Sequence, residues 1–227
     1  LANEKSKEIE EIASQLSKYL SPQLYDSIFS GEKKVSIESE KKFLTVFFSD
    51  IISFTEISDK MDSAPLTQML NLYLTKMSEV ALNFGGTIDK YIGDSIMIFF
   101  GDPKTKGRNK DAINCVQMAI EMQNTMKILS KVFMKDFNLP YPLNMRIGIN
   151  SGECTVGNFG SEKRLDYTVI GGAVNLASRL ESNSPAGKIL ISDVTEKLIR
   201  DAINCQKYDQ IKATGISKPI TTYIPYF

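Results

Sequence analysis

Short apolar runs typical of buried strands alternate with longer amphipathic segments from Phe43 onward, and this alternation is the strongest constraint on the fold. The first run, FLTVFFSD, is rich in aromatic and β-branched residues and ends at Asp50. The segment from Leu66 to Phe84 then repeats apolar residues at helical spacing, and Gly85-Gly86 after it favours a helix end. The alternation predicts an α+β fold, a mixed α/β sandwich in which helices cover a central sheet.

Later segments continue the same pattern. The runs TIDKYI and SIMIFF are separated by Gly93-Asp94, which predicts a hairpin with Asp94 at or beside its turn. Further strands are expected at LNMRIGIN, YTVI and KILIS and near residues 207–212 and 220–226, and further helices at residues 111–130, 173–181 and 194–203.

Residues 1–30 form a predicted helical lead-in. Its apolar residues recur at a 3-4-3 spacing that gives one narrow stripe, formed by Ile9, Ile12, Leu16 and Tyr19. This stripe is equally consistent with a helix that packs on its own domain and with a coiled-coil signalling stalk that dimerises. Ser21-Pro22 is typical of an N-cap followed by proline at the first helical position. We expect residues 31–42 to be a linker and residues 43–227 to form the main domain.

The chain contains no histidine. This removes the commonest general base, the usual activator of a serine or cysteine nucleophile, and the commonest zinc ligand. The three cysteines lie far apart and form no CxxC motif, so neither a disulfide framework nor a thiolate metal site is indicated. An enzyme built from this chain must use carboxylates, lysine or arginine, hydroxyl groups or oxygen-bound metals.

Charge and hydropathy limit the cellular environment and the binding partners that we expect for this chain. The 27 basic residues balance 27 acidic residues, which argues against bulk attraction to nucleic acid or to an anionic membrane. No run approaches the ~20 apolar residues needed to cross a bilayer. We therefore expect a cytoplasmic segment that does not insert into a membrane and does not bind nucleic acid. The start at Leu1 rather than Met suggests a piece of a longer protein.

Two aspartates are candidate metal ligands. Asp50 ends a buried strand and Asp94 lies at a hairpin turn, so both carboxylates reach one sheet edge if the strand lies beside the hairpin. Alone, a strand-end aspartate is more often a helix cap or turn former. Between strand and helix, the segment from Ile51 to Phe54 and Thr55 would turn backbone N–H groups toward whatever Asp50 holds, which favours phosphate, although a plain turn explains it equally well.

Four polar side chains are candidate substrate contacts. Lys90 lies four residues before Asp94, and Thr168 lies in the strand YTVI. Asn175 and Arg179 follow at i, i+4, so an amide and a guanidinium project from one helical face. Arginine suits phosphate because it offers paired N–H donors. In isolation, Lys90 is better explained as a solvated strand lysine, and an exposed helix whose side chains contact only water is the alternative for Asn175 and Arg179.

Four motifs together resemble, in order and spacing, the catalytic domain of class III nucleotide cyclases: TVFFSDIISFT, GGTIDKYIGDSIM, MRIGINSGECTVGNFGS and LDYTVIGGAVNLASRLE. The resemblance covers residues 43–226, and LSKYLSPQLYDSIFSGE is similar to the helical lead-in of many bacterial members. It implies a ferredoxin-like βαββαβ core with additions. It also implies conversion of a nucleoside triphosphate to its 3′,5′-cyclic monophosphate and pyrophosphate.

The resemblance further implies two bound metal ions in an active site that is shared between the subunits of a homodimer. Asp50 and Asp94 would bind two Mg²⁺ or Mn²⁺ ions, with the Ile51 carbonyl in the same loop. Subunits of the family pair head to tail, so each site would take this acidic pair from one subunit and the substrate contacts from the other. An upstream sensory module would act through the helix of residues 1–30.

Substrate roles follow from the same resemblance. Lys90 and Thr168 would contact the purine edge, Asn175 would orient the ribose, and Arg179 would stabilise charge on the reacting phosphate. The family's C-terminal triphosphate-binding lysine is not matched, because Thr214 occupies its place and leaves Lys212 as the candidate two residues earlier.

Hydrogen-bond polarity favours ATP as the substrate. Adenine presents an N1 acceptor and a 6-amino donor; Lys90 can donate to the first, and the Thr168 hydroxyl can accept from the second. Guanine has the reverse pattern, and guanylate-forming relatives usually carry Glu and Cys at these positions, whereas a Lys/Thr pair resembles the cyanobacterial-type adenylate cyclases. A guanylate cyclase and a catalytically silent nucleotide-binding module are the alternatives, the second disfavoured because both aspartates, the asparagine and the arginine are present.

Overall fold

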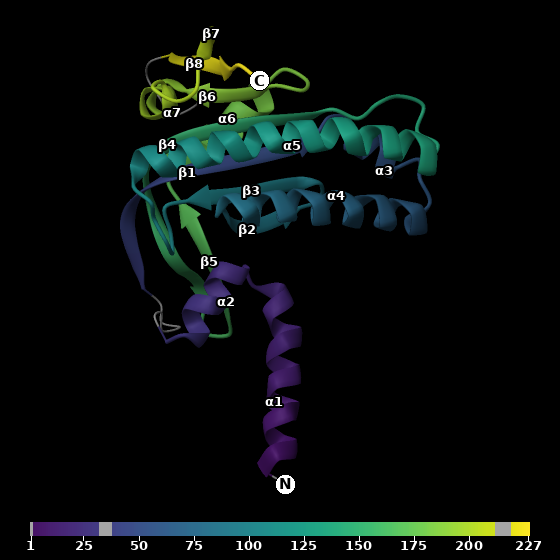
Figure 1. Ribbon diagram of the computed structural model, residues 1–227, viewed down its shortest axis with the longest axis vertical. Coiled ribbons are helices and arrows are strands. Elements are labelled where there is room, and N and C mark those ends of the chain that lie inside the picture. Colours follow the sequence, from purple (N-terminus) through teal and green to yellow (C-terminus); the bar gives the residue numbers. More distant parts are fainter. Residues whose placement is uncertain (1, 32–37, 212–218) are drawn as a thin grey trace.

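The computed structural model describes residues 2–31, 38–211 and 219–227, and its strands form one eight-stranded mixed sheet (Figure 1). The strands are β1 (Ser39–Ile51), β2 (Thr87–Ile92), β3 (Ser95–Phe100), β4 (Met145–Ser161), β5 (Arg164–Ile170), β6 (Ile189–Ser192), β7 (Cys205–Ile211) and β8 (Ile220–Pro225). The helices are α1 (Ala2–Leu16), the 3-10 helix η1 (Ser17–Tyr19), α2 (Pro22–Phe29), α3 (Phe54–Ser58), α4 (Ser63–Phe84), α5 (Arg108–Asp136), α6 (Gly172–Asn183) and α7 (Asp193–Ile199).

The first half of the main domain is a ferredoxin-like unit. The chain order β1, α4, β2, β3, α5, β4 gives βαββαβ, and these four strands lie in the order β2-β3-β1-β4 with every neighbour antiparallel. The sheet continues through β6, which runs parallel to β4, to β8 and β7, while β5 pairs with β4 beside this row. The α+β fold expected from the sequence is confirmed.

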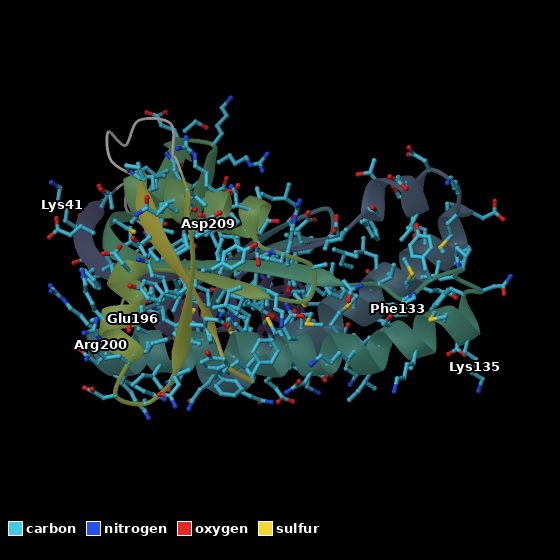
Figure 2. The ribbon with its side chains drawn as sticks, turned by 90° about the horizontal axis from the view of Figure 1, so that it is seen from above. Lys41, Phe133, Lys135, Glu196, Arg200 and Asp209 are labelled. Carbon is cyan, nitrogen blue, oxygen red and sulfur yellow. The ribbon has the colours of Figure 1, made fainter. Side chains whose placement is uncertain are left out.

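Two hydrophobic cores lie on opposite faces of the sheet. Because side chains alternate along a strand, Phe47 and Ile98 belong to the core that contains α4 and α5. Their neighbours Val46 and Phe99 belong to the second core, which α6 covers with residues that include Ala177. Seen from above, α5 spans the molecule, with Phe133 and Lys135 near one end and Glu196 of α7 near the other (Figure 2). The site residues therefore lie on a sheet packed on both faces.

Several elements are longer than the apolar pattern predicts. β1 begins at Ser39, within the segment expected as linker, because residues 39–42 pair with Cys154 to Gly157 of β4. The charged residues of this part tolerate strand structure because its side chains are largely exposed, and Lys42 forms an ion pair of 2.6 Å with the buried Asp102. β4 likewise runs to Ser161, beyond the expected run LNMRIGIN.

The lead-in forms the expected helices, and Ile9, Ile12 and Tyr19 of its apolar stripe are exposed. The Ser21 hydroxyl accepts a hydrogen bond of 3.3 Å from the Leu24 amide, which confirms the predicted N-cap before Pro22. α1 projects away from the sheet (Figure 1), with Ile9 66% and Ile12 52% exposed, so it does not pack on its own domain. No helix in the described ranges is long and apolar enough to cross a bilayer.

Candidate active site

The structure brings Asp50 and Asp94 to the same edge of the sheet. Asp50 is the penultimate residue of β1, and Asp94 lies in the tight turn between β2 and β3, where β3 pairs with β1. The Ile51 amide donates a hydrogen bond of 2.8 Å to Asp94 Oδ2, and the Ser95 hydroxyl donates one of 3.3 Å to Asp50 Oδ1. The hairpin turn is thus tied to the end of β1 by reciprocal contacts.

The two carboxylates fit a divalent cation. Burial, and then the neighbouring Asp50, raise the pKa of Asp94 to about 7, because a second negative charge is unfavourable there. Carboxylate and carbonyl oxygens are the ligands that Mg²⁺ prefers, and the Ile51 carbonyl belongs to the same chain segment. No cluster of three or more histidine, cysteine or acidic side chains able to hold a metal occurs among the described residues. A metal here would thus depend on this aspartate pair.

In the absence of metal, the protein is expected to lose stability as the pH rises from about 4 to about 7. The raised pKa of Asp94 means that the folded state binds its proton more tightly than the unfolded state. This contribution is fully present below the ordinary pKa of 3.8 and is lost as the pH rises through about 7. Urea midpoints measured in chelator at several pH values should show the fall, and excess Mg²⁺ should reverse it at pH 7.5.

The matched control for this pH dependence is Asp94→Asn, which cannot ionise. The difference between the urea midpoints of the wild type and Asp94→Asn should change with pH as Asp94 titrates. Mg²⁺ should stabilise the variant less than it stabilises the wild type. A difference that stays constant across this pH range would contradict the assignment.

Arg146 is a site residue that the sequence reasoning missed. It lies directly opposite Asp50 in the register of β1 and β4, and its guanidinium donates a hydrogen bond of 2.8 Å to Asp50 Oδ2. Its Nε atom also forms an ion pair of 2.6 Å with Glu181 of α6. Burial raises the pKa of Glu181, while the facing Arg146 lowers it. The ion pairs of Arg146 with Asp50 and Glu181 therefore connect α6 to the end of β1.

The turn after β1 places Phe54 and Thr55 in α3. Ser53 before them has a left-handed backbone with φ of 59°, which turns the chain sharply out of the strand. Phe54 packs against the main core, whereas Thr55 is exposed. Backbone groups and the exposed Ser53 and Thr55 hydroxyls of this turn are therefore the groups available to a ligand near Asp50.

Lys90 and Thr168 meet through a third residue, Asp89. The Thr168 hydroxyl donates a hydrogen bond of 2.6 Å to Asp89 Oδ2, and Lys90 Nζ lies 3.2 Å from Asp89 Oδ1. β2 and β5 carry these residues, so the pairing expected from the sequence is present within one chain. Asp89 could not be predicted as part of this group, because a residue next to Lys90 in a regular strand would point to the opposite face of the sheet.

Asn175 and Arg179 lie on the outward side of α6. The buried side chains of this helix include Val174, Ala177 and Leu180, which pack on the sheet, whereas Asn175 is exposed and Arg179 half-buried. The i, i+4 spacing places them about 40° apart around the helix axis, while Glu181 lies well over 100° from both. The helix therefore presents the asparagine and arginine away from the Arg146 contact. The candidate Lys212 lies outside the described residues.

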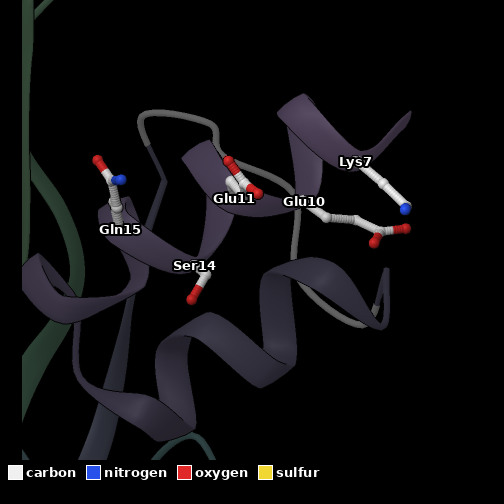
Figure 3. Close-up of a pocket in the computed structure, with 5 residues that line it drawn as sticks. All are labelled: Lys7, Glu10, Glu11, Ser14 and Gln15. Atoms are coloured by element: carbon white, nitrogen blue, oxygen red, sulfur yellow. The ribbon is translucent and has the colours of Figure 1, made fainter. Parts of the chain in front are cut away.

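The described surface includes the following hollows. One lies along α1 and is lined by Lys7, Glu10, Glu11, Ser14 and Gln15, none of which is a candidate residue (Figure 3). The other, of about 340 Å³, lies between the lead-in at Tyr19 to Leu24 and the strands β2, which carries Asp89 and Lys90, and β5. The hollow in Figure 3 is therefore unrelated to the carboxylate pair.

Residues 37–225 match the family model for the adenylate and guanylate cyclase catalytic domain. The crystal structure of the adenylyl cyclase CyaB from P. aeruginosa is 52% identical, with a TM-score of 0.81 over 84% of this chain and 96% of that chain. The crystal structure of the guanylyl cyclase Cya2 is 34% identical, with a TM-score of 0.77 over 82% of this chain and 93% of that chain.

Curated proteins give the same assignment. The terminal-differentiation specific adenylate cyclase of Dictyostelium discoideum is 32% identical over 224 residues, which cover 96% of this chain and 10% of that protein. The chain spans less than half the length of the first curated relatives that it matches. Solved relatives include a dimeric guanylyl cyclase domain. With a family match over most of its length and 52% identity to CyaB where the two chains align, the chain belongs to the adenylate and guanylate cyclase catalytic domains.

Proposed function

We propose that this chain is an adenylate cyclase catalytic domain that converts ATP to 3′,5′-cyclic AMP and pyrophosphate. In this reaction the ribose 3′-oxygen bonds to the α-phosphorus, and the bond from that phosphorus to the pyrophosphate oxygen breaks. The observation that carries the proposal is the contact of Asp50 and Asp94 at one sheet edge, in a chain whose Lys90 and Thr168 also come together. Relatives of both base specificities share the fold, so the base preference depends on that second pair.

Asp50, Asp94 and the Ile51 carbonyl would hold two Mg²⁺ or Mn²⁺ ions. When bound, these ions stabilise the negative charge that develops on the phosphate oxygens. The carboxylates provide hard oxygen ligands. Burial and the neighbouring Asp50 raise the pKa of Asp94 because a second negative charge is unfavourable there, and a bound cation would relieve this.

The remaining side chains orient the nucleotide. Asn175 would hold the ribose so that its 3′-oxygen lies in line with the α-phosphorus, and Arg179 would donate to the phosphate that reacts. Arg146, next to Asp50, would contribute positive charge toward the triphosphate. The backbone at Phe54 and Thr55 and the side chain of Lys212 remain candidates for further phosphate contacts.

A head-to-tail homodimer would complete the site. Asn175 and Arg179 face outward from α6, while Glu181 on the other side of this helix is linked through Arg146 to Asp50 of the same chain. This arrangement supports a site in which the acidic pair of one subunit meets the asparagine and arginine of its partner.

The lead-in supports regulation by an upstream module. α2 packs on β2, the strand that carries Lys90, and the hollow between them is lined by Tyr19, Leu24 and Lys90 among others. Residues 1–30 would therefore act as a signalling stalk, and residues 43–227 as the catalytic domain. A shift of the lead-in would reach the base contacts directly.

With Mn²⁺ present, the dimeric protein is expected to form cyclic AMP from ATP with a kcat/KM at least about 100-fold above that for cyclic GMP from GTP. The physical reason is that Lys90 and Thr168 match the hydrogen-bond pattern of adenine. Product chromatography on protein of verified dimeric state measures both rates. Faster turnover of GTP would establish the guanylate cyclase alternative, and no product from either nucleotide would establish a silent binding module.

A further inference from the structure

Asp89 occupies a β-bulge in β2. Ile88 pairs with Ile98 and Lys90 pairs with Met97, so Asp89 is an extra residue with no partner of its own on β3. In a regular strand, neighbouring side chains point to opposite faces of the sheet. The bulge re-aims the chain, and the carboxylate of Asp89 meets the ammonium group of Lys90 at 3.2 Å.

The Asp89 carboxylate is enclosed by donors of the base-contacting group. Its side chain is 1% exposed, and it accepts the 2.6 Å hydrogen bond from the Thr168 hydroxyl. The Val169 backbone also donates to it. The contact of Oδ1 with Lys90 is an ion pair rather than an aligned hydrogen bond, because this oxygen has no hydrogen-bond partner among the described residues.

Lys90 and Thr168 match adenine only while the Thr168 oxygen acts as the hydrogen-bond acceptor. An ammonium group only donates, so Lys90 can donate to N1 of adenine or equally to O6 of a 6-oxopurine. A threonine hydroxyl both donates and accepts, so Thr168 could face either a 6-amino group or a 6-oxo group by rotation. The choice depends on where the hydroxyl proton is directed.

We propose that Asp89 is a positioning residue that sets the base preference of the site, by taking the Thr168 hydroxyl proton and leaving the Thr168 oxygen as an acceptor for the 6-amino group of adenine. The inference rests on the proposed cyclase function and deepens it. An ionised carboxylate only accepts, so Asp89 fixes the direction of the hydrogen bond without touching the nucleotide. Lys90, the other side chain proposed to contact the base, is held against the same carboxylate by its ion pair.

Some features around Asp89 disfavour its negative charge, and others favour it. Burial raises the pKa of Asp89, while the Thr168 hydroxyl, Lys90 and the Val169 amide lower it. Three donors converge on a carboxylate that water hardly reaches. This is the arrangement expected where a buried charge is kept for the direction of its hydrogen bonds.

The test compares ATP with inosine triphosphate in wild-type and Asp89→Asn dimers. Inosine carries 6-oxo and N1–H groups in place of the 6-amino group and N1 acceptor, without the 2-amino group of guanine. In the variant, the introduced amide should turn its carbonyl toward Lys90 and its NH₂ toward Thr168, so the hydroxyl must donate outward. The ratio of kcat/KM for ATP to that for inosine triphosphate should fall at least about 10-fold, or about 1.4 kcal/mol.

Three further variants separate positioning from structural damage. Asp166→Asn removes an exposed carboxylate from the same strand as Thr168 and should leave the ratio unchanged. In a Thr168→Val background, Asp89→Asn should no longer alter the ratio, because no hydroxyl remains to orient. Asp89→Ala, which frees the hydroxyl to rotate, should give an intermediate ratio and serves if Asp89→Asn does not fold.

The outcomes distinguish this inference from the function on which it rests. A wild-type protein that forms no cyclic nucleotide would overturn the proposed function. Cyclic AMP formation in the wild type, with equal losses for both nucleotides in the Asp89 variants and an unchanged ratio, would overturn the role of Asp89 alone.

Discussion

An equimolar mixture of Asp50→Ala and Arg179→Ala proteins is expected to recover about a quarter of wild-type cyclase activity, because random pairing makes half of the dimers mixed and each mixed dimer holds one intact site. Each variant alone should lose at least about 100-fold in kcat, since one lacks a cation ligand and the other a phosphate donor in every site. Cyclic AMP formation after verified subunit exchange measures the recovery.

The contact between Asp50 and Arg146 supplies a matched control for this experiment. Both side chains come from one subunit, 2.8 Å apart, and so belong to the same half of the site. Mixing Asp50→Ala with Arg146→Ala should leave every site with one defect, and activity should stay at the level of the variants alone. Recovery in this control, or none in the first mixture despite subunit exchange, would refute the proposed division of the site.

Local patterns of the sequence are enough to locate β1, the β2–β3 hairpin and α6. Strand and helix periods are short, so runs such as FLTVFFSD and the spacing of Asn175 and Arg179 carry their own structural information. The Gly93-Asp94 turn fixes where Asp94 lies relative to its hairpin. The same reasoning brought Asp50 and Asp94 toward one sheet edge, because a strand end and a hairpin turn can meet in few ways.

Contacts made across the sheet could not be predicted in this way. Arg146 lies 96 positions from Asp50, and their contact depends on the register of β1 and β4. Asp89 joins Lys90 and Thr168 only because a bulge re-aims one residue of β2, a shift that no apolar pattern records. Likewise, the apolar stripe of α1 indicates a helix face suited to packing, but it does not identify the surface that would pack against it.

Gly148→Ala is expected to lower the free energy of unfolding by about 3 kcal/mol, which would shift the urea midpoint down by about 1 M. Gly148 lies in β4 under α6, and a Cβ atom there would lie 2.0 Å from the Glu181 amide nitrogen and 2.4 Å from the Ala177 carbonyl oxygen. Both obstacles are helix backbone, so the clash cannot be relieved by rotating a side chain. A glycine within a strand often marks such a close approach of another backbone.

The same substitution should also impair catalysis, because α6 must move outward to admit the methyl group. That movement would displace Asn175 and Arg179 and stretch the ion pair between Arg146 and Glu181, so cyclase activity should fall more than the loss of folded protein explains. Gly172→Ala is the matched control, since a Cβ atom on this first residue of α6 meets nothing within 4 Å. It should leave stability unchanged or raise it slightly through helix propensity. Equal urea midpoints for the two variants would show that α6 does not depend on the close contact at Gly148.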